Sequence, residues 1–327
     1  MPLFDLLRGQ RLSNDAFTSE ILAEASLLYQ GQLAPAMHGR KIISYQSLSK
    51  WAQTEVAGEI RNHPDAIIVH HADEKLRHHR RNYGRNLVIR SYFSPFLRNR
   101  FLFIPSGFNP DLVSEIRKIS LQRQRKNLVS FAGSMKNNRH EMIDVFRQCN
   151  EAVFAVGGAQ FLEDMVLSNS ELADLMSQSY FTLCPFGSKS AETWRVLEAL
   201  EAGSIPVQVR FLGHDYSSVI FGHHPFIVEN TWEDALAVVL ELSKDKGRLQ
   251  RKQEEVADFY RVWRGNLAED FCRIGMNGRF KDLVSPQFRI QRRVSQNPVL
   301  FVRYFWEFKV PENTKLLLRH MRKRLFA

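Results

Sequence analysis

The chain has 327 residues, of which 44% are hydrophobic and 24% are charged, and its formal net charge is +10. This length exceeds what one hydrophobic core usually supports, so we expect two globular domains of ordinary size. No apolar run approaches the ~20 residues needed to cross a bilayer, which excludes a transmembrane helix within the chain.

Three short apolar strands are predicted in the first third of the chain, at 65–74, 86–93 and 101–107. Each one ends in polar or small residues, namely Asp73, Glu74, Arg90 and Gly107. Because ligands of doubly wound sheets lie beyond the carboxyl ends of the strands, we expect these four residues to face a cleft.

A basic patch accompanies these strands, since residues 75–100 hold eight Lys and Arg and no acidic residue. Such a patch can attract an anionic substrate into a cleft, or it can be a solvated helix face. The second interpretation suits Arg77, Arg80 and Arg81. Arg90 differs because it lies inside an otherwise apolar strand, which favours a role in substrate binding.

The polar and basic run 117–126 predicts the end of a helix followed by a linker, although a solvated helix face fits it equally well. We place the domain boundary here. The expected division is a first domain at 1–124, a second domain at 125–285 and a basic helical extension at 286–327.

The second domain is predicted to open with an apolar strand at 127–134 that runs into the small residues Gly133 and Ser134. Small residues allow the backbone to approach a ligand closely. Lys136 and Arg139 follow at once, and basic side chains at this position can reach phosphate groups. The segment therefore predicts part of a phosphate-binding site.

A strand, loop, helix and strand are predicted between residues 180 and 209. Pro185 and Gly187 stop the first strand, and Ser190 is expected to cap the helix, whose first N–H groups attract phosphate. Gly203 is expected to close the helix before a buried strand at 206–209.

Arg195 and Glu198 lie three residues apart on this helix and therefore share one face. Arginine offers a planar fork to a diphosphate, and glutamate accepts hydrogen bonds from ribose hydroxyls, so the pair suits a nucleotide diphosphate. The alternative is an ordinary βαβ unit in which the two side chains merely pair on a solvated helix face.

A helix is predicted at 249–263, after Gly247. Farther along the chain, residues 286–327 hold ten basic residues and two acidic ones. The segment 314–326 combines an apolar stripe with Lys and Arg, as in a helix that lies on an anionic membrane surface. The same stripe can equally pack against its own protein.

The segment around Arg195 resembles the C-terminal signature of exostosin-type glycosyltransferases, which includes the group near ribitol-phosphate xylosyltransferase. The residues that match this signature are Cys184, Pro185, Gly187, Arg195, Glu198, Ala199, Leu200, Gly203, Ile205, Pro206 and Val207. Phe186 stands where the family often has Arg, and Thr193 replaces a Ser while keeping its hydroxyl. The Phe-x-Gly at 131–133 and the Ile-Pro-x-Gly at 104–107 are also similar to the family.

The resemblance implies an α/β fold of GT-B architecture, in which two Rossmann-like domains face a cleft and C-terminal helices cross back. It also implies an inverting transfer from a nucleotide sugar, for which a UDP-sugar is expected, to a hydroxyl of a glycan or lipid-linked acceptor. No metal or other cofactor is expected, because Arg, Lys and helix dipoles replace a divalent ion in such architectures. Asp73 and Glu74 are the candidate bases, with His70 and His71 behind them.

A polyanion-binding protein and a non-catalytic scaffold descended from a transferase are the alternatives. Nucleic acid is not expected as a partner, because no recognised motif accompanies the basic windows. The start of the chain lacks the pattern of a secretory leader, and three cysteines without metal spacing fit a reducing compartment. We therefore expect a cytoplasmic protein that is peripheral to the inner face of the membrane.

Overall fold

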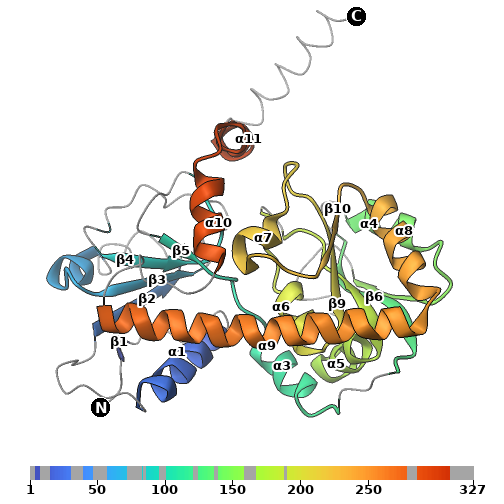
Figure 1. The fold of residues 1–327 in the computed structure, drawn as a ribbon, viewed down its shortest axis with the longest axis horizontal. Helices are drawn as coiled ribbons and strands as arrows, with labels where there is room; N and C mark the ends of the chain where they lie inside the picture. Colours follow the sequence, from blue (N-terminus) through green and yellow to red (C-terminus); the bar gives the residue numbers. More distant parts are fainter. Residues whose placement is uncertain are drawn as a thin grey trace, which may run out of the picture.

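The computed structural model describes residues 4–7, 15–30, 40–46, 57–71, 83, 86–95, 101–120, 124–135, 139–157, 167–187, 190–277 and 286–309. Within these ranges, the chain forms two parallel sheets side by side, one from each half of the sequence, and one long helix runs beneath both (Figure 1). The two Rossmann-like halves and the helix that crosses back are the expected GT-B architecture.

The first sheet has the strand order β1-β2-β3-β4-β5, and every neighbouring pair is parallel. Its strands are β1 (Phe4–Leu7), β2 (Arg40–Gln46), β3 (Ile67–His71), β4 (Leu87–Arg90) and β5 (Phe101–Phe103). Alternate residues of a strand point to opposite faces. Accordingly, Ile67 and Val69 join the main hydrophobic core, whereas Ile68 joins a smaller cluster on the other face.

The second sheet has the strand order β10-β9-β8-β6-β7 and is also parallel. Its strands are β6 (Asn127–Ser134), β7 (Ala152–Gly157), β8 (Ser179–Leu183), β9 (Ile205–Val209) and β10 (Ile227–Glu229). After β6, the chain forms β7 on one side of β6 and then crosses to form β8 on the other side of β6. The carboxyl ends of β6 and β8 therefore flank the point where the winding reverses, which is where open α/β sheets bind ligands.

Helices cover and connect the two sheets (Figure 1). They are α1 (Asp15–Gln30), α3 (Pro110–Ile116), α4 (Arg139–Phe146), α5 (Asn169–Ser177), α6 (Arg195–Glu201), α7 (Tyr216–Phe221), α8 (Trp232–Ser243), α9 (Lys246–Asn277), α10 (Pro286–Ser295) and α11 (Pro298–Lys309). The long helix α9 packs against α1 of the first half, where Trp263 stacks on Phe17 with ring centroids 6.1 Å apart. This contact continues one hydrophobic core from one half into the other.

The basic run 117–126 is not a solvated helix face where the structure describes it. Helix α3 ends at Ile116, and Arg117 caps it while binding Glu20 and Glu201. The Arg125 guanidinium donates to four backbone carbonyls, those of Met176, Ser179, Ala202 and Gly203. Burial lowers the pKa of Arg125 to about 10. This arginine therefore ties β8 to the end of α6.

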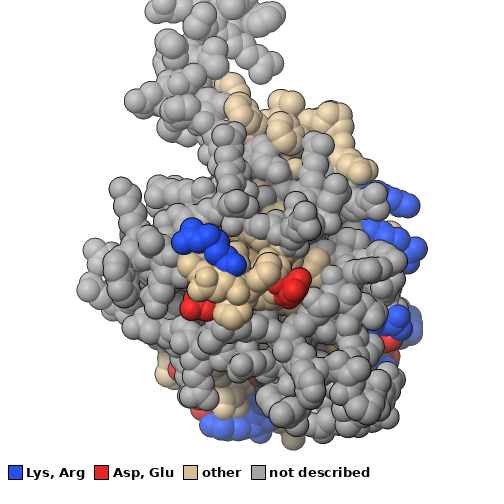
Figure 2. Space-filling view, turned by 90° about the vertical axis from the view of Figure 1, so that its left-hand side faces the viewer, with Lys and Arg blue, Asp and Glu red and all other residues tan. Residues whose placement is uncertain are grey.

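On the side of the molecule that carries the first sheet, described Lys or Arg atoms lie close to described Asp or Glu atoms (Figure 2). Of the eight Lys and Arg residues in the basic patch at 75–100, the structure describes Arg90 alone. Among the helices that the structure describes, none is long and apolar enough to span a membrane.

Candidate functional site

Two arginines converge on the carboxyl end of β6. The Arg195 Nη2 donates to the carbonyl oxygen of Ala132 at 2.9 Å, and the Arg139 Nη1 donates to that of Ser134 at 2.6 Å. These acceptors are alternate residues of one strand, so the two guanidiniums lie over the same strand end. Arg139 comes from the first turn of α4 and Arg195 from the first turn of α6.

Arg139 also reaches the end of β8, because its Nη2 donates to the Phe186 carbonyl at 3.5 Å. It therefore spans the winding reversal between β6 and β8. Burial, and after it the nearby charge of Arg195, lowers the pKa of Arg139 to about 10. Two like charges held this close repel one another, and a bound anion would relieve that repulsion.

Arg195 and Glu198 form the expected ion pair, with Nη1 3.0 Å from Oε2. Their side chains are only 17% and 5% exposed, so the pair is buried rather than lying on a solvated helix face. The other carboxylate oxygen of Glu198 accepts from the backbone N–H of Asn109 at 3.2 Å. Asn109 caps α3, the first helix after β5. Glu198 thereby links the Arg195 helix to the segment that leaves the first sheet.

Gly133 makes room for Arg139 at the end of β6. A Cβ atom at this position would lie 3.2 Å from Cζ of Phe131 and 3.5 Å from Nη1 of Arg139. The φ angle of Gly133 is 155°, a backbone conformation that L-residues rarely adopt. The tighter of these two contacts is with Phe131, over whose ring Arg139 lies at 5.7 Å, so a side chain at 133 would press on the ring that supports this guanidinium.

The prediction that Ser190 caps the helix is wrong. Helix α6 begins only at Arg195, after Trp194, and no side chain caps it. The Ser190 hydroxyl instead accepts from the backbone N–H of Glu192 at 3.3 Å, and Thr193 Oγ1 accepts from that of Arg195 at 3.3 Å. Thr193 therefore supplies the hydroxyl nearest to the start of α6, while Ser190 shapes the loop before it.

Sequence reasoning missed Glu192, a carboxyl group in this loop that is only 6% exposed. Its Oε2 accepts from the backbone N–H of Tyr92 at 2.7 Å and from the hydroxyl of Tyr216 at 2.8 Å. Burial raises the pKa of Glu192 to about 7, although its hydrogen bonds act in the opposite direction. No motif marks this residue, and its partners lie 100 and 24 residues away in the chain.

The bond to Glu192 holds Tyr92 in an uncommon conformation directly after β4. Tyr92 has a φ of 63°, in the left-handed region that costs non-glycine residues energy. This is why the first-half strand predicted at 86–93 ends at Arg90. The carboxyl end of β4 is thus tied to the loop that leads into the Arg195 helix.

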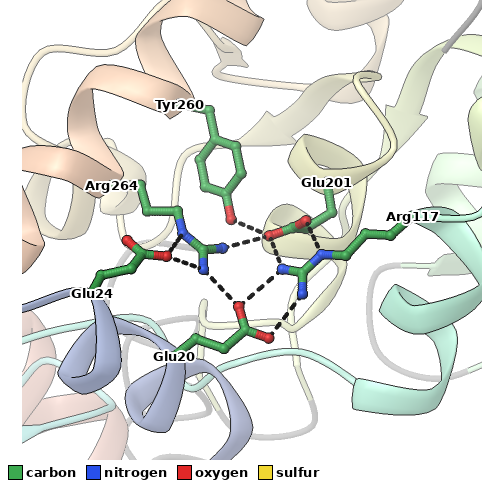
Figure 3. A network of polar contacts seen from close by, with 6 residues as sticks. All are labelled: Glu20, Glu24, Arg117, Glu201, Tyr260 and Arg264. Carbon is green, nitrogen blue, oxygen red and sulfur yellow. Dashed lines mark hydrogen bonds and ion pairs between the residues drawn. The ribbon is translucent and has the colours of Figure 1, made fainter. Parts of the chain in front are cut away.

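At the opposite end of α6, six charged or phenolic side chains form a second connection between the halves (Figure 3). The residues drawn are Glu20, Glu24, Arg117, Glu201, Tyr260 and Arg264. Glu201, the last residue of α6, accepts from Tyr260 at 2.7 Å and pairs with Arg264 at 2.9 Å. Arg264 pairs in turn with Glu20 of α1 at 2.6 Å. Both ends of the helix that carries Arg195 are therefore fixed to the first half.

The remaining predicted residues divide into two groups. Asp73, Glu74 and Lys136 lie outside the described residues. So does the segment 314–326, for which a membrane surface and packing against the protein are both expected possibilities. Pro185 and Gly187 lie in the loop after β8, as expected. Arg90 is fully buried within β4, and its role in substrate binding stays a prediction.

The structure also bears on two other kinds of chemistry, nucleophilic attack by a cysteine and metal binding. Burial raises the pKa of the Cys184 thiol far above its usual range, and its Sγ contacts the Thr182 carbonyl at 3.3 Å, so this thiol is not a nucleophile. Among the residues that the structure describes, no group of three or more His, Cys, Asp or Glu could hold a metal ion.

A family model described as the RXYLT1 C-terminal domain matches residues 110–280, a range that includes Arg139, Glu192, Arg195 and Glu198. Their partners Tyr92 and Asn109, and the Figure 3 residues Glu20 and Glu24, lie before the matched range. No curated protein matches the chain.

The fold is similar to solved structures at low sequence identity. An α1,3-fucosyltransferase with GDP-fucose is 14% identical, with a TM-score of 0.38 over 71% of this chain and 93% of that one. Alr3699/HepE of Anabaena, in complex with UDP and glucose, is 12% identical, with a TM-score of 0.40 over 91% of this chain and 100% of that one. The OtsA apo structure is 10% identical, with a TM-score of 0.46 over 81% and 79%.

Proposed function

The chain belongs to the family of the RXYLT1 C-terminal domain and is an exostosin-like glycosyltransferase, and from that premise we propose a metal-independent, inverting transfer from a UDP-sugar. The acceptor is a hydroxyl of a glycan or of a lipid-linked glycan. In this proposal, the second half of the chain (125–285) binds the donor and the first half (1–124) binds the acceptor.

The observation that supports donor binding is the pair of guanidiniums at the carboxyl ends of β6 and β8. Arg139 and Arg195 are both largely buried there, and their charges repel. A diphosphate brings two negative charges that would offset this repulsion and accept charge-assisted hydrogen bonds. Ser134, Thr193 and the Gly187 loop border the same strand ends and would complete the contacts to the phosphates.

In the same proposal, Glu198 binds the ribose of the donor. Its Oε1 accepts a single backbone N–H, from Asn109, and a carboxylate oxygen has a second lone pair with which to accept from a ribose hydroxyl. The ion pair with Arg195 would then orient the carboxylate and the guanidinium together. One residue would hold the sugar of the nucleotide while its neighbour holds the diphosphate.

The reaction is a single displacement. The acceptor oxygen forms a bond to the anomeric carbon as the bond from that carbon to the UDP oxygen breaks, and the configuration inverts. The proton of the acceptor hydroxyl passes to Asp73 or Glu74, and the arginines stabilise the charge that develops on the departing diphosphate. A cytoplasmic protein at the inner face of the membrane, held there through 314–326, would meet lipid-linked acceptors.

Ligand-induced thermal shifts test the donor assignment. UDP should raise the Tm of the wild-type protein, GDP and CMP should raise it less, and Arg195→Ala should abolish the shift. Arg195→Lys should restore only part of it, because an ammonium cannot reproduce the fork. If UDP has no effect, or if Arg195→Ala responds like the wild type, the donor site lies elsewhere. A second experiment follows UDP release from UDP-sugars with and without EDTA, and a loss of activity with EDTA would exclude a metal-independent transfer.

A further inference from the structure

Helix α11 packs on the body of the protein through one face only. Leu300 and Tyr304 are 5% and 1% exposed. The Tyr304 ring meets Phe93 of the first half and Phe211 of the second half edge-on, with ring centroids 6.0 Å apart in both cases. These contacts fix which side of the helix faces inward.

The outward side of the same helix is apolar. Val299, Val302, Phe305 and Trp306 are 60%, 64%, 49% and 36% exposed. Because each residue advances about 100° around a helix, these four side chains cover an arc of about 120° that is centred opposite Leu300 and Tyr304. A helix on the surface of a water-soluble domain normally presents polar residues on that side. Here, both sides of the helix are apolar.

This face is not a scattering of single exposed residues. In the part of the chain that the structure describes, seven large hydrophobic side chains are exposed. Four of the seven lie on α11, within the eight positions 299–306. In the side view, the described atoms at the top of the molecule belong to uncharged residues (Figure 2), while Arg303 and Glu307 of α11 are exposed at the edge of this apolar face. A clustered apolar surface of this kind marks a contact with another molecule or with a membrane.

The charge around this face decides among the possible occupants. Residues 286–327 carry ten basic residues and two acidic ones. Arg289 and Arg293 of the preceding helix α10 are both exposed. Arg303 of α11 itself is also exposed. A valine, tryptophan and phenylalanine face on a helix that carries an exposed arginine matches the boundary between acyl chains and anionic headgroups. A second copy of the chain would bring the same positive charge to the contact and be repelled.

We propose that α11 is a membrane-docking helix, which inserts Val299, Val302, Phe305 and Trp306 into the interface of an anionic bilayer. Arg289 and Arg293 of α10, which are exposed, would pair with phosphate headgroups. Tyr304 touches both halves of the enzyme, so docking would hold the two halves at a fixed height above the membrane. Membrane docking through α11 is a property separate from the proposed sugar transfer, and the argument for it does not require that reaction.

Vesicle flotation tests the proposal with the full-length protein. The wild type should float with vesicles that contain phosphatidylglycerol, should not float with pure phosphatidylcholine, and should bind less as salt rises. Val302→Glu should weaken binding to the anionic vesicles by about tenfold, since it places a charge in the apolar interface. Val262→Glu is the matched control, because Val262 is 50% exposed on the distant helix α9. This control should bind like the wild type.

Tryptophan fluorescence separates membrane docking through α11 from simple electrostatic attraction by the basic residues of 286–327. Brominated lipids should quench the tryptophan fluorescence of the wild type, whereas Trp306→Phe should still bind but lose most of the quenching. Failure to bind anionic vesicles, or equal binding by Val302→Glu, would overturn the proposal. A wild-type dimer in light scattering that Val302→Glu dissociates would assign this face to a second copy instead.

Discussion

The Tyr216 hydroxyl donates to Glu192 Oε2 at 2.8 Å and accepts from the backbone N–H of Phe93 at 3.0 Å. Phe93 follows the fourth strand of the first sheet, whereas Tyr216 and Glu192 belong to the second half. One phenol group therefore joins the two halves beside the loop that leads to Arg195. Burial raises the pKa of this phenol well above its usual range, so the hydroxyl keeps its proton.

The protonation of Glu192 should make folding stability depend on pH. Its pKa is raised from 4.5 to about 7 on folding, so its contribution is complete below about pH 4.5 and is lost as the pH rises through about 7. The size is of the order of 3 kcal/mol. Denaturant unfolding between about pH 4 and about pH 8 should show this loss in the wild type but not in Glu192→Gln.

The glutamine variant is informative because its amide oxygen can still accept from Tyr92 and Tyr216. Glu192→Ala removes that acceptor and should be less stable than Glu192→Gln at every pH. If the glutamine variant keeps the full pH dependence of the wild type between these limits, another group causes it. A larger KM for the donor in Glu192→Ala, with partial recovery in Glu192→Gln, would show that this carboxyl positions the loop before Arg195.

Arg139→Met should separate anion binding from stability. The methionine keeps contact with the Phe131 ring and removes a buried charge that Arg195 repels. The Tm without ligand should therefore change little, while the shift caused by UDP should fall by more than half. A large loss of Tm without ligand would mean that the hydrogen bonds from Arg139 to Ser134 and Phe186 matter more than the repulsion.

Gly133→Ala should destabilise the protein by about 1–3 kcal/mol, because an L-residue is strained at a φ of 155° and its Cβ would press on Phe131. The variant should also weaken UDP binding, because the same Cβ approaches Arg139. Gly265→Ala in α9 is the matched control. No atom lies within 4 Å of its added Cβ, so it should be neutral or stabilise the protein by up to ~1 kcal/mol.

The network in Figure 3 should couple α1 to α6. Glu201→Gln removes one carboxylate from between Arg117 and Arg264 and leaves their charges less compensated, so it should cost about 2–4 kcal/mol. Lys244→Ala breaks the exposed pair with Glu241 and should leave the free energy of unfolding almost unchanged. Denaturant unfolding of both variants provides the comparison, and equal costs would contradict a cooperative network.

Much of the second half could be predicted because its signals are local. The strand at 127–134 has the predicted bounds, and the strand predicted at 180–184 lies at Ser179–Leu183. The pairing of Arg195 with Glu198 follows from helical spacing alone. The start of their helix was misplaced at Ser190 because the loop before it is shaped by distant partners. Glu192 is held by Tyr92 and Tyr216, and these bonds outweigh the local tendency of serine to cap a helix.

The order of residues along the chain by itself determined several of the strands and the arginine and glutamate of one helix, because hydrophobic periodicity acts over a few residues. The architecture of two facing domains followed from the short motifs that resemble the family. Only the tertiary structure decided that Arg139 and Arg195 meet over one strand end and that burial raises the pKa of Glu192 to about 7. It also decided which face of α11 remains open. The physical reason is that burial and charge repulsion depend on groups that packing brings together from distant parts of the chain.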